Sequence, residues 1–272
     1  MDDSKNIRLK ISYKGTFYHG WQKQLGRETI QETIEKTFQS IFGKKIHLIG
    51  SGRTDSGVHA FNQTANFKTD LSVNAFKIGQ ALNSMLPKDI RIKASEEVDL
   101  DFHSRFNAIG KTYIYCIYNN RIANPLINDY CYKVAYKLDT SAMQKAASQF
   151  KGEHDFSGFT ASGSSAKTTI RNIYDIRLMC HHYLLILIVT GNGFLYKMVR
   201  NIAGTLVDVG RGRLASDNIG EIILSQDRDT VGHTAKSQGL SLLDVYYDSN
   251  DMNAFLNILN SEKSLDTLVS LL

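Results

Sequence analysis

Residues 7–13 read Ile-Arg-Leu-Lys-Ile-Ser-Tyr, and this alternation of apolar and polar side chains predicts a strand with one buried face. The spacing of apolar residues in the following segments predicts, in order, a helix over 28–42, strands over 46–49 and 58–67, a helix over 73–86 and a strand over 90–92. The order strand–helix–strand–strand–helix–strand is typical of the split βαβ plan, in which the helices cover one face of a sheet.

A second alternating stretch, Lys-Thr-Tyr-Ile-Tyr-Cys-Ile-Tyr at 111–118, predicts a strand that opens a further run of elements. In this run we expect helices over 140–150, 194–209 and 217–224 and strands over 170–179, 183–190 and 241–247. The sequence therefore predicts an α+β fold of two similar split-βαβ (ferredoxin- or RRM-like) halves. We place the domains at 1–105 and 106–248, with an appended helical tail at 249–272.

The 272-residue chain is long enough for two modest domains, and its longest apolar run, residues 183–189, is far shorter than the roughly 20 residues of a membrane-spanning helix. Acidic and polar residues follow Met1 directly, so no secretory leader or membrane association is expected. Cys116, Cys131 and Cys180 form no CxxC pair, which favours reduced thiols in the cytoplasm. No zinc-site spacing is present, so no metal site is expected.

The net charge of +5 is unevenly distributed along the chain. Residues 241–272 hold five acidic residues and one basic residue, and residues 1–240 hold 31 basic and 22 acidic residues. This excess of positive charge permits a polyanionic partner such as a nucleic acid, although many ordinary cytosolic enzymes are equally basic.

The most informative segment is Gly-Ser-Gly-Arg-Thr-Asp-Ser-Gly at 50–57, a glycine-rich loop between two expected strands. It lacks the GxxxxGK[ST] pattern of a phosphate-binding loop, and it leads into a strand rather than a helix. Asp55 can be a solvated turn residue, or it can act as a nucleophile, a general base or a metal ligand. Since no other carboxylate lies in the loop, a nucleophilic role is the sharper hypothesis.

Two further side chains are candidates for a site. Arg200 lies beside the apolar stripe of the helix expected over 194–209, so we expect it to be partly buried and paired with a carboxylate, for which Asp55 is the candidate. Tyr113 and Tyr115 share one face of the strand expected over 111–118. Such tyrosines usually belong to the core, and stacking on a nucleobase is the alternative.

Several motifs occur in a recognisable order. They are GWQKQ at 20–24, GRTDSGVHA at 52–60, RFNA at 105–108 with KTYIY at 111–115, GEHDF at 152–156 and FLYKMVRNI at 194–202. Together they resemble the TruA family of tRNA pseudouridine synthases, and the resemblance extends from residue 7 to about residue 247.

This resemblance implies isomerisation of uridine to pseudouridine in the tRNA anticodon stem-loop, at nucleotides 38, 39 and 40. It also implies a fold in which the antiparallel sheets of two similar α+β halves join around a central basic cleft. A homodimer that grips one tRNA with both subunits is implied as well, and no metal or organic cofactor is expected.

By position, the resemblance makes Asp55 the nucleophilic aspartate and Arg200 the arginine that pairs with it. Tyr113 corresponds to the aromatic residue that packs on the target base and is a candidate for the final proton removal. Arg53 corresponds to the loop arginine that holds the flipped nucleotide, and Leu240 to an apolar residue that lines the pocket. The resemblance leaves three roles open for the aspartate: it attacks C1′, it attacks C6, or it assists the formation of a glycal.

The chain departs from the family pattern at a few positions. Lys197 stands where many members carry histidine, Asn62 replaces a common glycine, and Lys236 stands where proline is usual. The acidic, leucine-rich tail after Tyr247 lies outside the family core.

Two other functions fit parts of the sequence. The first is an RNA-binding or tRNA-folding protein on the same fold, with reduced or lost catalysis. The joint presence of Asp55, Tyr113 and Arg200 favours the enzyme, because a binding protein has no need of a buried Asp–Arg pair. The second is a hydrolase of a small phosphorylated substrate with an aspartate nucleophile, and the chain lacks the phosphate loop and Mg²⁺-binding carboxylates which that chemistry usually requires.

Overall fold

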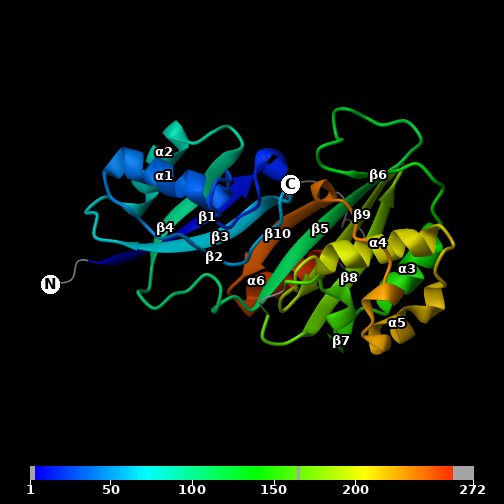
Figure 1. The fold of residues 1–272 in the computed structure, drawn as a ribbon. Helices are drawn as coiled ribbons and strands as arrows, with labels where there is room; N and C mark the ends of the chain where they lie inside the picture. The colour runs from blue at the N-terminus through cyan, green and yellow to red at the C-terminus, as the bar shows by residue number, and fades with distance from the viewer. Residues whose placement is uncertain (1–3, 164–165, 260–272) are drawn as a thin grey trace. The chain divides into compact units, whose positions relative to one another are not determined.

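The computed structural model describes residues 4–163 and 166–259, and the chain divides into two compact units. The first unit comprises Met1–Ile109 and Leu242–Tyr247, and the second comprises Gly110–Ser241 and Asp248–Leu272. Each unit combines antiparallel strands with helices (Figure 1). The expected α+β class is therefore confirmed.

The sheet of the first unit is built around its N-terminal strand, which pairs antiparallel with a strand on each side. Its strands in spatial order are β4 (Ile90–Val98), β1 (Lys5–Tyr13), β3 (His59–Thr69) and β10 (Leu240–Tyr246), with the short β2 (Ile49–Gly50) also paired to β3. The first two residues of β10, Leu240 and Ser241, belong to the second unit. Helices α1 (Ile30–Phe42) and α2 (Ala75–Met85) lie together on one face of β1, β3 and β4 (Figure 1).

Helix α1 shows how the sequence directs this packing. Its N-terminus is capped by Thr29, whose side chain accepts a hydrogen bond from the backbone N–H of Glu32 at 3.4 Å. The apolar stripe of the helix faces the sheet, where the ring of Phe38 meets that of Phe67 on β3 edge-on, with 5.1 Å between centroids. The amphipathic spacing in the sequence thus places one helix face in the core.

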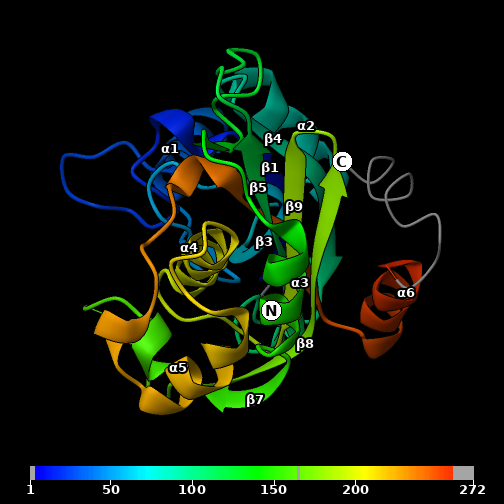
Figure 2. The ribbon, with the colours of Figure 1, turned by 90° about the vertical axis from the view of Figure 1, so that its right-hand side faces the viewer.

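The second unit contains another, mostly antiparallel, arrangement of strands. Its strands in spatial order are β5 (Gly110–Asn119), β9 (Leu184–Gly191), β8 (Ile170–His181) and β7 (Gly152–Asp155), with β6 (Tyr132–Val134) paired parallel to β5. Its helices are α3 (Thr140–Ser148), α4 (Met198–Gly210), α5 (Ile219–Ser225) and α6 (Ser249–Leu259). Figure 2 shows α3 and α4 on one face of β8 and β9, and α6 beyond the opposite face.

Single-turn 3-10 helices complete the described secondary structure. They lie at Gly15–Phe17, Ser157–Phe159, Ser216–Asn218, Arg228–Thr230 and Ser237–Gly239. Among the described residues, no helix has both the length and the apolar character needed to cross a membrane.

Most elements match the sequence-based expectations, but some do not. The helix expected from residue 194 begins at Met198, because Lys197 has a left-handed φ of 60°. The strand expected over 46–49 is wrong except at its last residue, which begins β2. Strands β6 and β7 are too short to produce a periodic pattern and were not expected. The tail forms α6 as far as Leu259, and the remainder of the expected helical tail lies outside the described residues.

A close backbone approach joins α4 to the segment after α5. At Gly204, in the middle of α4, an added Cβ would collide with the carbonyl oxygen of His233. Only glycine therefore allows the 231–235 segment to lie this close to the helix.

The substitution Gly204→Ala is expected to lower the free energy of unfolding by about 1–3 kcal/mol, because the backbone must shift to relieve the collision. Gly220→Ala in α5 is the matched control, since the nearest atom to its added Cβ is Gln149 Oε1 at 3.7 Å. That control is expected to be neutral or up to about 1 kcal/mol more stable. Urea unfolding measures both, and equal effects of the two substitutions would contradict the tight contact.

Candidate functional site

Asp55 lies in the loop between β2 and β3, and its side chain is partly exposed to solvent. The backbone N–H of Val58 donates to the Asp55 carbonyl at 3.1 Å, which closes a tight turn. The N–H of Trp21 donates to the carbonyl of the preceding residue, Thr54, also at 3.1 Å. Backbone hydrogen bonds at Thr54 and Asp55 thus fix the position of this partly exposed residue.

Buried side chains of the sheet form hydrogen bonds with the loop that carries Asp55. Gln63 of β3 is fully buried, and its Oε1 accepts a hydrogen bond from Ser51 Oγ at 2.6 Å while its Nε2 donates to the carbonyl of Gly52 at 3.0 Å. The hydroxyl of Tyr13 on β1 lies 2.8 Å from Thr54 Oγ1. Burial raises the pKa of Tyr13 above its usual value, so this phenol stays neutral.

The segment before α1 packs against the other side of the loop. Gly20 has a left-handed φ of 86°, and an added Cβ there would lie 2.5 Å from the carbonyl oxygen of Thr54. The adjacent Trp21 is buried, and its indole lies against Gly50. Residues 20–21, which the GWQKQ motif contains, therefore determine how closely the Asp55 loop packs.

Tyr113 extends from β5 in the second unit and is 8% exposed. Its ring meets that of Phe194 edge-on, with 5.2 Å between centroids and an interplanar angle of 85°. This contact holds the plane of the Tyr113 ring. The burial of Tyr113 agrees with the expectation that such tyrosines usually belong to the core.

Arg200 lies on the first turns of α4 and is partly exposed. Its Nε donates to the carbonyl of Ala235 at 2.8 Å, and the backbone N–H of Ala235 donates to the Arg200 carbonyl at 3.1 Å. The hydroxyl of Tyr115 donates to the neighbouring carbonyl of Lys236 at 2.7 Å. Burial raises the pKa of Tyr115, and the positive charge of Arg200 opposes this effect. Residues 235–236 thus position both side chains.

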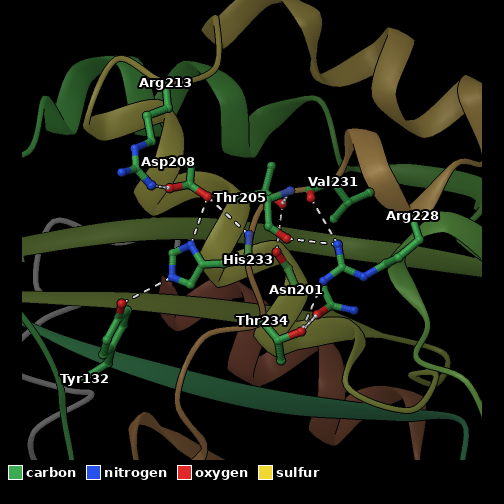
Figure 3. A network of polar contacts seen from close by, with 10 residues as sticks. Tyr132, Asn201, Thr205, Asp208, Arg213, Arg228, Val231, His233 and Thr234 are labelled. Atoms are coloured by element: carbon green, nitrogen blue, oxygen red, sulfur yellow. Dashed lines mark hydrogen bonds and ion pairs between the residues drawn. The ribbon is translucent and has the colours of Figure 1, made fainter.

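A polar network holds the segment that carries Ala235 (Figure 3). Asp208 of α4 is buried, and its Oδ2 accepts hydrogen bonds from the backbone N–H of His233 at 3.1 Å and from its Nδ1 at 2.8 Å. On the far side of the ring, His233 Nε2 lies 3.2 Å from the hydroxyl of Tyr132 on β6. Arg213 adds positive charge 3.7 Å from Asp208 Oδ1.

The other half of this network surrounds Arg228. Its Nη1 donates to the carbonyls of Val231 and Gly232, both at 3.0 Å, and its Nη2 donates to Thr234 Oγ1 at 3.2 Å. Thr234 Oγ1 in turn donates to Asn201 Oδ1 on α4 at 2.7 Å (Figure 3). Residues 231–235 are therefore fastened to α4 at several points, and the carbonyl that orients Arg200 is fixed in place.

The remaining residues expected at the site fall on both units. Arg53 is exposed and lies in the same loop as Asp55. Leu240 is buried at the start of β10. The structure thus groups Arg53 with Asp55 on the first unit, and it places Tyr113, Arg200 and Leu240 on the second.

Several supporting residues were missed by the sequence analysis. Gln63 could have been suspected, because a polar amide at an inward position of an alternating strand needs a buried partner. The partnership of Asp208 with His233 gives no sequence signal, since the two residues are separated along the chain and belong to different elements. Within residues 4–163 and 166–259, no three His, Cys, Asp or Glu side chains are arranged as a metal site.

Comparison with known proteins gives a consistent result. A family model described as tRNA pseudouridine synthase matches residues 10–107 and 146–248. The tRNA pseudouridine synthase A of Acetivibrio thermocellus is 49% identical over 243 residues, which cover 89% of this chain and 100% of that protein. The proteins of the same name from Caldicellulosiruptor bescii and Caldicellulosiruptor saccharolyticus are 49% and 47% identical, with the same coverage.

The substitution Gln63→Leu is expected to loosen the Asp55 loop, because it leaves the Ser51 hydroxyl and the Gly52 carbonyl without their buried partner. We expect a loss of about 1–3 kcal/mol in stability, together with faster hydrogen exchange at the amides of Gly57 and Val58. Asn83→Leu is the matched control, because Asn83 makes a similar pair of hydrogen bonds to Ile92 elsewhere in the unit. It is expected to lower stability without selective exchange at the loop, so equal loop exchange in both variants would contradict the role of Gln63.

Proposed function

The chain belongs to the tRNA pseudouridine synthase family, and we propose that it isomerises uridines 38, 39 and 40 of the tRNA anticodon stem-loop to pseudouridine. The family match supports the reaction on tRNA uridine. The anchored loop supports the choice of Asp55 as nucleophile, because its backbone is held on both sides while its carboxylate remains partly exposed.

The reaction breaks the N1–C1′ bond of uridine and forms a C5–C1′ bond, while the proton on C5 is lost and N1 gains one. Product and substrate are therefore isomers, and no oxidant or group donor is required. Asp55 supplies an anion to the nucleoside during the detachment of uracil.

Arg200 is proposed to pair with Asp55. The hydrogen bond from its Nε to the Ala235 carbonyl directs the guanidinium. The planar fork of donors in this group suits a carboxylate. Such a pair orients the carboxylate and balances its charge when a bound nucleotide has excluded water. The network of Asp208 and His233 supports this role by fixing the segment that contains Ala235.

Tyr113 is proposed to stack on the extruded uracil and to remove the C5 proton. The target base lies within a stem-loop, so it must leave its stack at a cost of a few kcal/mol. Stacking on an aromatic ring is worth about 1–3 kcal/mol and offsets part of this. Phe194 supports the role, because its edge-on contact holds the plane of the Tyr113 ring.

Arg53 and Leu240 complete the proposed pocket. The exposed guanidinium of Arg53 is suited to hold the flipped nucleotide by its phosphate, and the buried Leu240 to line the pocket. The same proposal describes the enzyme as a cytoplasmic homodimer that acts without a metal or an organic cofactor. Light scattering during gel filtration tests the dimer, and turnover after treatment with a chelator tests the metal.

Replacement of the nucleophile gives the decisive test of the mechanism. Asp55→Asn is expected to lower pseudouridine formation in an anticodon stem-loop transcript by about 10³-fold or more, because the amide cannot supply an anion. The dissociation constant for tRNA is expected to stay within about threefold, since phosphates provide most of the affinity. Asp101→Asn, at an exposed aspartate, is the control and is expected to keep full activity.

The outcomes separate the two functions that the sequence permits. Retained turnover in Asp55→Asn would remove Asp55 from the mechanism. Tight tRNA binding without turnover in the wild type would favour the RNA-binding or tRNA-folding alternative.

Binding of tRNA is expected to weaken steeply with salt, because residues 1–240 carry 31 basic and 22 acidic residues. Neutralisation of about six phosphates predicts a loss of about 10³-fold in affinity between 50 and 200 mM salt. Filter binding over this range measures the slope. A flat response would contradict recognition through phosphates.

A further inference from the structure

Two of the three cysteines lie close together in the second unit. Strands β5 and β6 run parallel with Ile117 opposite Tyr132, so Cys116 on β5 lies beside Cys131, the residue that directly precedes β6. The two thiols interact, and each shifts the pKa of the other. The third cysteine, Cys180, lies on β8 and is exposed.

The two thiols differ in their readiness to react. The interaction with Cys116 lowers the pKa of Cys131, whereas this same interaction and burial raise the pKa of Cys116. The thiolate is the reactive form of cysteine, so Cys131 is the first nucleophile of the pair. Cys131 is 6% exposed, and Cys116 is partly exposed.

We propose that Cys116 and Cys131 form a dithiol site that reacts with low-molecular-weight disulfides, such as glutathione disulfide, and closes a disulfide between β5 and β6. The Cys131 thiolate attacks one sulfur of the reagent, the reagent's S–S bond breaks, and one thiolate leaves. Cys116 then loses its proton and attacks the Cys131 sulfur, which releases the second thiolate. The protein loses two hydrogens, and the reagent is reduced to two thiols.

The cross-link closes the connection between β5 and β6 into a covalent loop. This connection carries the exposed apolar side chains of Ile122 and Leu126. Cys131 also precedes Tyr132, whose hydroxyl contacts His233 in the network of Figure 3. The disulfide thus links β6, which carries Tyr132 of that network, covalently to β5. This proposal does not depend on the isomerase reaction, in which neither cysteine has a role.

The test uses the full chain with Cys180→Ser, which removes the exposed thiol and prevents exchange with it. The folded protein is incubated with glutathione disulfide, quenched in acid and measured by intact mass and peptide mapping. We expect the loss of two hydrogens and a linked peptide pair that contains Cys116 and Cys131. With Cys116→Ser added, a stable glutathione adduct on Cys131 is expected, and with Cys131→Ser added, reaction at Cys116 is expected to be about tenfold slower or more.

Circular dichroism shows whether each variant is folded before the reagent is added. The proposal is overturned if the folded protein keeps both hydrogens, or if Cys131 holds a glutathione adduct that Cys116 never displaces. A cross-link that forms only after unfolding in urea overturns it as well, because the pairing would then not belong to the native strands.

Discussion

The two hydrogen bonds of the Gln63 side chain are the constraint on which the loop that carries Asp55 depends. An amide buried in a sheet is unfavourable unless both its donor and its acceptor are satisfied. Ser51 and Gly52 satisfy them, and both lie just before Asp55. The same two contacts therefore satisfy the buried amide of Gln63 and fix the position of the loop.

In the second unit, an irregular segment is held in place by a charged side chain and a close backbone contact instead of a neutral amide. The 231–235 segment has no regular secondary structure. Hydrogen bonds to Asp208 and Asn201 hold it against α4, and the missing side chain of Gly204 lets it lie close to the helix. The Ala235 carbonyl reaches Arg200 only because this whole segment is fixed. The side chain of Arg200 is therefore held in a defined orientation, and a flexible loop could not hold it so.

The sequence predicted most of the fold because the strands and helices follow their periodicities over seven or more residues. It failed where the determining contact was distant along the chain or the element was very short. The start of α4 depends on a left-handed residue, Lys197, which no apolar pattern reveals. For the site, the motif around Asp55 indicated where chemistry is possible. The partners that hold it, Gln63 and Tyr13, and the link from Asp208 to His233 follow only from three-dimensional contacts.

The position of Trp21 has a practical consequence. It is the only tryptophan of the chain, and it is buried against Gly50 with its backbone N–H bonded to the Thr54 carbonyl. The intrinsic emission of the protein above the tyrosine range therefore comes from one ring that touches the Asp55 loop. The wavelength and lifetime of that emission therefore report on hydration and packing where this ring meets the loop. The molecule thus contains a native optical probe with which loop motion during substrate capture can be followed without an attached dye.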